Sequence, residues 1–212
     1  MSIYQSAASL RKNDSRRISH LIIGRNNITE LAVSLYNEKA ISLFGLALAN
    51  GSLADVASKI VDAAADRERN IIQFINAHCV NVAQQDADYL ASVRSADILL
   101  PDGSGLRQAA KLAGIGPVDN LNGTDLFPHI CEKASQANQS IFLLGGKPGV
   151  AAAAAKNMRN RYPGLHFAGT RNGYFSEGEH QQVIDQCLCI VGQFADDGPV
   201  TAVIHGGSGI LG

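Results

Sequence analysis

The sequence predicts an α/β protein built on a parallel sheet with crossover helices on both faces. From residue 40 onward, short β-type runs alternate with segments of helical periodicity, which is the pattern of parallel strands joined by helices. Each run is apolar enough to be covered on both faces. A chain of 212 residues with 46% hydrophobic and 17% charged residues can also bury a substantial core. We therefore expect one domain over residues 40–212.

The expected strands follow one another along this domain. In chain order they are 41–46, 71–75, 97–100, 140–144, 165–169 and 200–204. Residues 1–39 differ from the rest, because Arg and Lys cluster there among Ser and Asn. We interpret this segment as a weakly ordered N-terminal extension, for which a solvated terminus is favoured about two to one over contact with anionic lipid.

Helices are expected between the strands, and most have a recognisable start. A Ser followed three residues later by an acidic residue resembles a capping box, Thr can cap a helix, and Pro is tolerated in a first turn. The expected starts are Ser52 with Asp55, the turn after Asp102 for a helix running to Leu112, Thr124 with Pro128 in about the first turn, Pro148 for a helix ending near Tyr162, and Ser176 with Glu179.

Charge and cysteine content exclude several classes of function. A net charge of -1 provides no basic field for nucleic-acid phosphates, so nucleic acid is not an expected partner. The four cysteines form no CxxC pair and are expected to be reduced core residues. No signal-peptide pattern and no apolar run of roughly 18–20 residues is present. A cytoplasmic protein is expected, with peripheral attachment to the inner face of the cytoplasmic membrane left open.

Polar residues gather just after the expected strands, where ligands bind in open α/β sheets. Asp102 lies between an apolar strand and a glycine turn, so its carboxylate could accept a proton as a general base. The alternative, an Asp that caps the next helix or braces the turn, is equally favoured at this point. Asn76 could bind a hydroxyl group or a base, or could fix its own loop through backbone bonds.

The turn from Gly145 to Gly149 leads into a helix and is suited to a diphosphate. Glycines allow close approach of phosphates, the start of a helix attracts anions, and Lys147 could add charge. An ordinary strand-to-helix turn is about as well supported, because neither a Walker A motif nor GxGxxG is present. Asn122 to Asp125 combines a turn with a helix start, where Asp125 would complement the helix dipole and lie near the cleft mouth.

Taken in order, these segments resemble the WecG/TagA/CpsF proteins, glycosyltransferase family 26, from about Ala40 to Ser176. The residues in the matching segments are most similar to those of the exopolysaccharide branch of the family, to which xanthan-type GumM proteins belong. The matching blocks are Phe74-Ile75-Asn76-Ala77-His78, Leu100-Pro101-Asp102-Gly103, Asn122-Gly123-Thr124-Asp125-Leu126, Phe142 to Pro148, and Gly169 with Asn172-Gly173-Tyr174-Phe175.

The resemblance implies a Rossmann-like domain that transfers a sugar, with inversion, from a UDP-sugar donor to a saccharide acceptor on a polyprenyl diphosphate. It implies catalytic roles for Asp102 as the base and for Asn76 beside it. No metal ion or other cofactor is expected, and a homo-oligomer is compatible with the sequence. The residues expected to bind substrate are Gly103, Asn122, Thr124, Asp125, Gly145, Gly146, Lys147, Asn172, Gly173 and Tyr174.

The match breaks near the C-terminal end. Family members continue with a Gly-x-Pro-x-Gln-Glu motif and a basic tail, whereas this sequence has Ile204-His205-Gly206-Gly207 and stops at Gly212. We therefore expect a domain truncated at that end, and the alternative is an inactive family member that keeps the fold and nucleotide binding. An active transferase is favoured about three to one. A dinucleotide-binding protein is disfavoured, because GxGxxG is absent.

Overall fold

The computed structural model describes residues 40–65, 70–179, 181–183, 185 and 200–204. These residues form two compact units, each described by itself. The first unit contains residues 40–52 and 70–122, and the second contains residues 53–65 and those from 123 onward. The expected N-terminal extension lies outside the described residues, and the interpretation of 40–212 as one domain stays a prediction.

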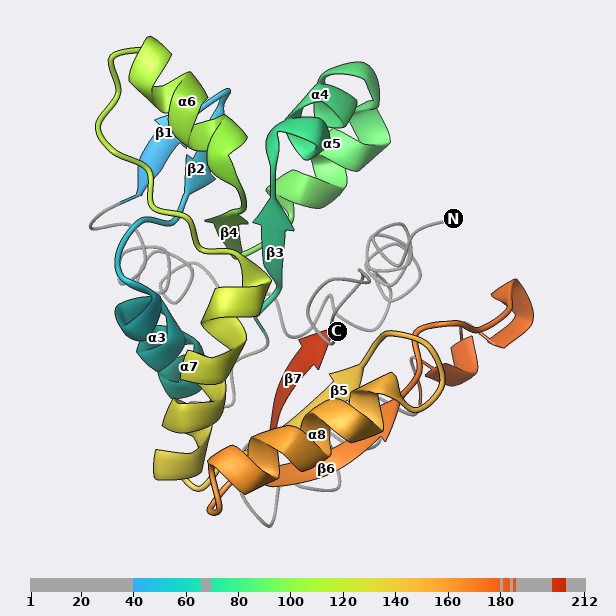
Figure 1. Cartoon of the computed structure of the whole chain (residues 1–212). Coiled ribbons are helices and arrows are strands. Elements are labelled where there is room, and N and C mark those ends of the chain that lie inside the picture. The colour runs from blue at the N-terminus through green and yellow to red at the C-terminus, as the bar shows by residue number, and fades with distance from the viewer. Residues whose placement is uncertain (1–39, 66–69, 180, 184, 186–199, 205–212) are drawn as a thin grey trace, which may run out of the picture. The chain divides into compact units, whose positions relative to one another are not determined.

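The first unit has a four-stranded sheet in the order β1-β2-β4-β3. β2 pairs with β4, and β4 with β3, in parallel, whereas β1 and β2 are antiparallel. Its elements are β1 (Ile41–Leu43), β2 (Leu46–Leu48), β3 (Ile72–Ile75), α4 (Ala77–Gln85), α5 (Ala87–Arg94), β4 (Ile98–Pro101) and α6 (Ser104–Leu112). All four residues of β4 are buried, as expected for a central strand (Figure 1).

The expected strand at 41–46 is wrong, because the segment is a hairpin of two short strands. Phe44 and Gly45 connect β1 to β2, and both have positive φ angles, of 54° and 71°. Two successive residues of this kind form the tight turn whose twist matches an antiparallel pair. The sequence did not predict this turn, because a bulky residue such as Phe44 is rarely found at a positive φ.

The second unit has a three-stranded sheet, β6-β5-β7, in which both pairings are parallel. Its elements are α3 (Leu53–Ala65), α7 (Gly123–Gln136), β5 (Ser140–Leu144), α8 (Val150–Arg161), β6 (His166–Arg171), the 3-10 helix η2 (Glu177–Glu179) and β7 (Val200–Ile204). α3 packs along α7 within this unit (Figure 1). The helix expected from Ser176 starts as η2, and its last residues, 187 and 188, lie outside the described ones.

The predicted fold class is confirmed, because the strands are mostly parallel and are flanked by helices. Five of the expected strands occur at or within about a residue or two of their expected bounds. Two expected helix starts are wrong. α7 begins at Gly123, so Thr124 lies inside its first turn and Pro128 is its sixth residue, and α8 begins at Val150, after Gly149 has taken a left-handed conformation with φ 89°.

Each unit has its own apolar core. Leu48, Ile75 and Leu106 are almost fully buried in the first unit, as are Leu126 and Cys131 in the second. Burial raises the pKa of the Cys131 thiol to about 12, so this side chain stays protonated at neutral pH. Cys79 and Cys131 are free thiols, as expected, and the other two cysteines lie outside the described residues. In the described part of the chain, no helix is both long and apolar enough to cross a membrane.

One buried polar side chain connects a helix to the central strand of the second unit. Gln139, 1% exposed, directly precedes β5, and its Nε2 donates a 2.8 Å hydrogen bond to the backbone oxygen of Val61 on α3. Its backbone N–H also donates to the oxygen of Ala134 on α7. A buried amide that satisfies its hydrogen bonds in this way fixes where β5 starts relative to α3 and α7.

We expect Gln139→Ala to lower the free energy of unfolding by about 1–3 kcal/mol, because the substitution removes the bond to Val61 and leaves a cavity. Urea denaturation followed by circular dichroism measures this change. Gln136→Ala is the matched control, because Gln136 is exposed at the end of α7 and should change stability by less than about 0.5 kcal/mol. Equal effects of the two substitutions would contradict the role of Gln139.

Candidate active site

Asn76 and Asp102 lie next to each other at one edge of the first sheet. β3 and β4 run in parallel with Ile75 opposite Pro101, so the residues that follow the two strands are neighbours. The pairing extends one step further, because the backbone N–H of Asp102 donates a 2.8 Å hydrogen bond to the oxygen of Ile75. This is the carboxyl edge of the parallel strands, where open α/β sheets bind ligands.

Asn76 has a structural role of its own. It is the N-cap of α4, with φ -122° and ψ 179°, and its Oδ1 accepts a 3.0 Å hydrogen bond from the N–H of Cys79. The loop-fixing alternative therefore holds for the carbonyl end of the side chain. The NH2 end is different, since among the described residues it has no partner. Asn76 is half-buried. Its side-chain oxygen bonds to its own helix, and its NH2 group stays available as a hydrogen-bond donor at the sheet edge.

Asp102 does not cap the helix that follows it. The N-cap of α6 is Gly103, with φ 84° and ψ 174°, a conformation that favours glycine, and no side chain bonds to the start of this helix. Within the described residues the half-buried carboxylate of Asp102 has no hydrogen bond and no ion pair. A carboxylate held by its backbone and unused by its surroundings can accept a proton from a bound alcohol.

The loop that returns from α6 holds this turn in place. Asn120 Oδ1 accepts a 2.7 Å hydrogen bond from the N–H of Gly103, and the N–H of Leu121 donates a 2.8 Å bond to the oxygen of Pro101. The same loop bonds to the segment that follows β2, where Asp119 Oδ2 accepts from the N–H of Gly51 at 3.0 Å. Sequence reasoning missed Asn120 and Asp119, because their partners are 17 and 68 residues away and no local pattern reports them.

Two helices begin side by side at this edge. A Cβ atom placed on Gly105 of α6 would lie 2.8 Å from the Cβ of Ala77, the first residue of α4, so only glycine allows this approach. The first turn of each helix carries backbone N–H groups without partners inside the helix, of which that of Cys79 is bonded to Asn76, and the positive end of the helix dipole. Both dipoles therefore favour negative charge near Asn76 and Asp102.

In the second unit, the loops after β5 and β6 are joined through their glycines. The N–H of Gly145 donates a 3.0 Å bond to the oxygen of Arg171, and the N–H of Gly173 donates a 2.9 Å bond to the oxygen of Gly146. A Cβ on Gly173 would lie 3.0 Å from the Cα of Gly145. Gly146 has φ 66°. Gly173 is therefore required by its close contact with the backbone of Gly145, whereas at Gly146 a side chain is disfavoured by the positive φ and by the nearby Val150 side chain.

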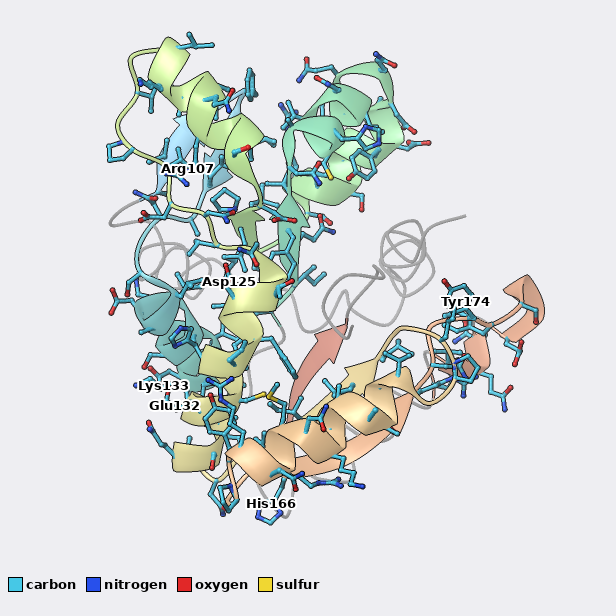
Figure 2. The ribbon with its side chains drawn as sticks, in the orientation of Figure 1. Arg107, Asp125, Glu132, Lys133, His166 and Tyr174 are labelled. Carbon is cyan, nitrogen blue, oxygen red and sulfur yellow. The ribbon has the colours of Figure 1, made fainter. Side chains whose placement is uncertain are left out.

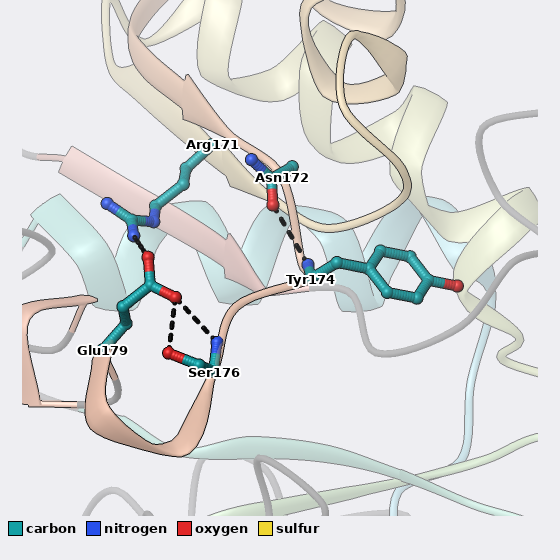
Figure 3. Close-up of polar contacts among 5 residues, drawn as sticks. All are labelled: Arg171, Asn172, Tyr174, Ser176 and Glu179. Carbon is teal, nitrogen blue, oxygen red and sulfur yellow. Dashed lines mark hydrogen bonds and ion pairs between the residues drawn. The ribbon is translucent and has the colours of Figure 1, made fainter.

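The loop after β6 is fixed by side chains of its own (Figure 3). Asn172 Oδ1 accepts from the N–H of Tyr174 at 3.1 Å, and Glu179 Oε2 accepts from both the N–H and the hydroxyl of Ser176, at 2.8 and 2.7 Å. These two bonds, with a smaller contribution from the Arg171 guanidinium, lower the pKa of Glu179. The bonds fix the loop, and Tyr174 is left 67% exposed.

The remaining candidates occupy the starts of two helices of the second unit or precede one. Lys147 is exposed, but its backbone oxygen already accepts the first amide of α8, that of Val150, at 3.0 Å. Thr124 and Asp125 are exposed in the first turn of α7, and Figure 2 shows Asp125 on this helix. Asn122, the last residue of the first unit, directly precedes α7.

All of the candidates except Thr124 and Asp125 therefore form two groups. The structure brings Asn76, Asp102 and Gly103 together at one sheet edge, with Asn122 further along the returning loop. At the edge of the second sheet, after β5 and β6, it brings together Gly145, Gly146, Lys147, Asn172, Gly173 and Tyr174. Thr124 and Asp125 belong to the second unit through α7. In the described part of the chain, no group of three His, Cys, Asp or Glu residues is placed to hold a metal ion.

We expect Gly173→Ala to destabilise the second unit by about 1–3 kcal/mol, because its methyl group would collide with the backbone of Gly145. Chemical denaturation followed by Tyr fluorescence tests this. Gly178→Ala is the matched control in the same segment, because a Cβ at that position meets no atom within 4 Å. If Gly173→Ala is as stable as the control, the two loops are not in the contact described.

Comparison with known proteins finds two relatives that carry the same name. Over 95 residues the chain is 34% identical to an N-acetylglucosaminyldiphosphoundecaprenol N-acetyl-beta-D-mannosaminyltransferase of Bacillus spizizenii, covering 45% of this chain and 37% of the relative. Over 107 residues it is 27% identical to a protein of the same name from Bacillus subtilis, covering 50% of this chain and 42% of the relative. The matches thus span about two fifths of the length of these relatives.

The family comparison covers more of the chain. The description of the WecG/TagA/CpsF glycosyl transferase family matches residues 41–188, which include both sheet edges and all of the candidate residues. The matched stretch contains every block of residues on which the resemblance was based. Because more than half of its residues match, the chain belongs to the WecG/TagA/CpsF glycosyl transferase family.

Proposed function

We propose that this protein is an inverting hexosyltransferase that moves a sugar from a UDP-sugar to a saccharide on a polyprenyl diphosphate. The observation that carries the proposal is the Asp102 carboxylate, which lies at the carboxyl edge of β3 and β4 and has no partner among the described residues. An attacking hydroxyl group needs a base of this kind. Family membership and the names of the two relatives support the same reaction type.

The proposed chemical step is a single displacement. A hydroxyl oxygen of the acceptor forms a bond to C1 of the donor sugar, the bond from C1 to the UDP oxygen breaks, and UDP leaves with the electron pair. Asp102 takes the proton of the hydroxyl group. The adjacent NH2 group of Asn76 orients a substrate hydroxyl, and holding the reactants in this geometry lowers the entropic barrier. Attack from the face opposite the leaving group inverts C1.

The second unit would supply nucleotide contacts. We propose that the loop from Gly145 to Gly149 approaches the diphosphate, with Lys147 adding charge, and that Asn172, Gly173 and Tyr174 bind the nucleotide beside it. Exposure of Tyr174 and Lys147 supports this role, because both side chains can reach a ligand (Tyr174 in Figure 2). Gly103, Asn122, Thr124 and Asp125 stay proposed substrate contacts at their own positions.

The relatives' names suggest which substrates to test first. They are named as enzymes that add N-acetylmannosamine to N-acetylglucosaminyl diphosphoundecaprenol. We propose this acceptor class for the present chain, and UDP-N-acetylmannosamine as the first donor in a panel that also contains its uronic acid and UDP-glucose. Work in exopolysaccharide synthesis at the inner face of the membrane stays part of the proposal. The inactive alternative is less favoured, and the presence of Asn76 and Asp102 side by side after β3 and β4 supports an active enzyme.

We expect Asp102→Asn and Asp102→Ala to lower kcat by at least about 100-fold, as removal of a general base does. Transfer from each UDP-sugar to a synthetic lipid-linked acceptor, followed by chromatography, provides the measurement. Asp88→Asn is the control, since Asp88 is an exposed carboxylate on α5 of the same unit. Full turnover by Asp102→Asn would show that the base has been assigned wrongly. No transfer by the unmodified chain with any donor would favour the inactive alternative.

Asn76→Ser separates the capping role of Asn76 from its proposed catalytic role. Serine is about as good an N-cap as asparagine, so stability should change by less than about 0.5 kcal/mol. The NH2 donor is lost, and kcat/KM should fall by at least about tenfold, the value of one good hydrogen bond in the transition state. Parallel denaturation and transfer assays check both values. Unchanged kcat/KM in a stable variant would limit Asn76 to capping α4.

A further inference from the structure

A groove lies on the first unit between α6 and the loop that follows it. Its volume is about 700 Å³, and it is lined by Ser104, Arg107, Gln108 and Lys111 on α6 and by residues 114–119 of the loop. This volume is within the range of roughly 300–1,000 Å³ that is usual for small-molecule sites. None of the proposed catalytic or nucleotide-binding residues lines the groove.

The groove carries unpaired positive charge. Arg107 and Lys111 are four positions apart on one face of α6, and both are exposed (Arg107 in Figure 2). Among the described residues neither side chain has an ion pair or hydrogen bond. The carboxylate in the groove, that of Asp119, already accepts from the N–H of Gly51. Like charges at this spacing repel each other by about 0.2–0.5 kcal/mol, so a bound anion would relieve the repulsion.

The spacing of the two cations suits a diphosphate. Along a helix axis, four residues span about 6 Å, which allows each cation to contact one of two linked phosphates. A guanidinium group binds phosphate through paired hydrogen bonds, and an ammonium group adds a mobile charge. Gln108 and Ser104, on the same side of the helix, offer further hydrogen-bond donors.

The groove also has a direction along α6. It begins at Ser104, two residues after Asp102, and continues past Arg107 to Lys111. The next residue, Leu112, is 89% exposed, the highest exposure among the large apolar side chains of the described residues. Along the chain, the Asp102 carboxylate is thus followed by the cations of Arg107 and Lys111 and then by the exposed apolar side chain of Leu112. A lipid-linked saccharide has the matching order of hydroxyl group, diphosphate and apolar chain.

We propose that the groove beside α6 binds the diphosphate of the lipid-linked acceptor, with Arg107 and Lys111 as its cationic contacts and Leu112 against the first part of the apolar chain. This inference rests on the proposed function for the identity of Asp102 as the base. The nucleotide also contains a diphosphate, but it has no apolar chain to contact Leu112. The apolar residue therefore favours the lipid-linked molecule.

Direct binding tests the proposal without any need for turnover. Farnesyl diphosphate, UDP and inorganic diphosphate are titrated separately into the full chain by isothermal calorimetry. We expect Arg107→Gln with Lys111→Gln to weaken farnesyl diphosphate binding by at least about tenfold and to leave UDP binding within about twofold. Leu112→Ser should weaken the binding of farnesyl diphosphate but not that of inorganic diphosphate. Lys156→Gln with Arg159→Gln, a pair of exposed cations on α8, removes the same charge and should change neither.

The outcomes separate this inference from the proposed function. Unchanged farnesyl diphosphate affinity in the Arg107 and Lys111 variant would overturn the inference, even if the chain transfers sugar and depends on Asp102. An equal loss of UDP affinity would also overturn it, because the groove would then be a nucleotide site. Farnesyl diphosphate binding that depends on both cations would support the inference even in a chain that transfers no sugar. In an active chain, the same variant should raise the KM for the acceptor at least about tenfold with kcat unchanged.

Discussion

The candidate site depends on the parallel pairing of β3 with β4. This pairing places Ile75 opposite Pro101, and a backbone hydrogen bond from Asp102 to Ile75 continues it beyond the last paired residues. A shift of one position would turn the side chains of one strand to the other face. The pairing is held in register by burial, because all four residues of β4 are inside the protein. The position of Asp102 therefore follows from the packing of the sheet.

The polar groups around Asp102 bond to other partners, which leaves its carboxylate without a hydrogen bond among the described residues. Gly103 occupies the N-cap position of α6, and Asn120 binds the glycine N–H from outside the turn. Asn76 caps α4 through its oxygen and keeps its NH2 group at the sheet edge. The turn after β4 is therefore held by Asn120 and by the backbone, without a hydrogen bond from the Asp102 carboxylate. A carboxylate left without a structural task at a ligand-binding edge is the feature on which the proposed chemistry rests.

The helix α6 contributes to both the core and the surface. Leu106 and Ala110 are buried against the first sheet, whereas Arg107 and Lys111 lie on the groove. Because a helical turn has 3.6 residues, these two sets point to different sides of the same element. The core residues fix the helix, and the rigid helix fixes the spacing of the cations. A binding groove beside a well-packed helix holds its charges in place before a ligand arrives.

The sequence by itself determined the fold class, most strand positions and the residues that follow each strand, because these depend on local periodicity and on apolar runs. It also predicted the family from ordered motifs. It could not decide what Asp102 and Asn76 do, since capping and catalysis use the same residue types. Tertiary structure showed that Gly103 caps α6 and that Asn76 caps α4. It also located the contacts of Asn120, the collision that requires glycine at position 173, and the hairpin at Phe44. These features join residues distant in sequence or depend on backbone angles, and such information exists only once the chain has folded.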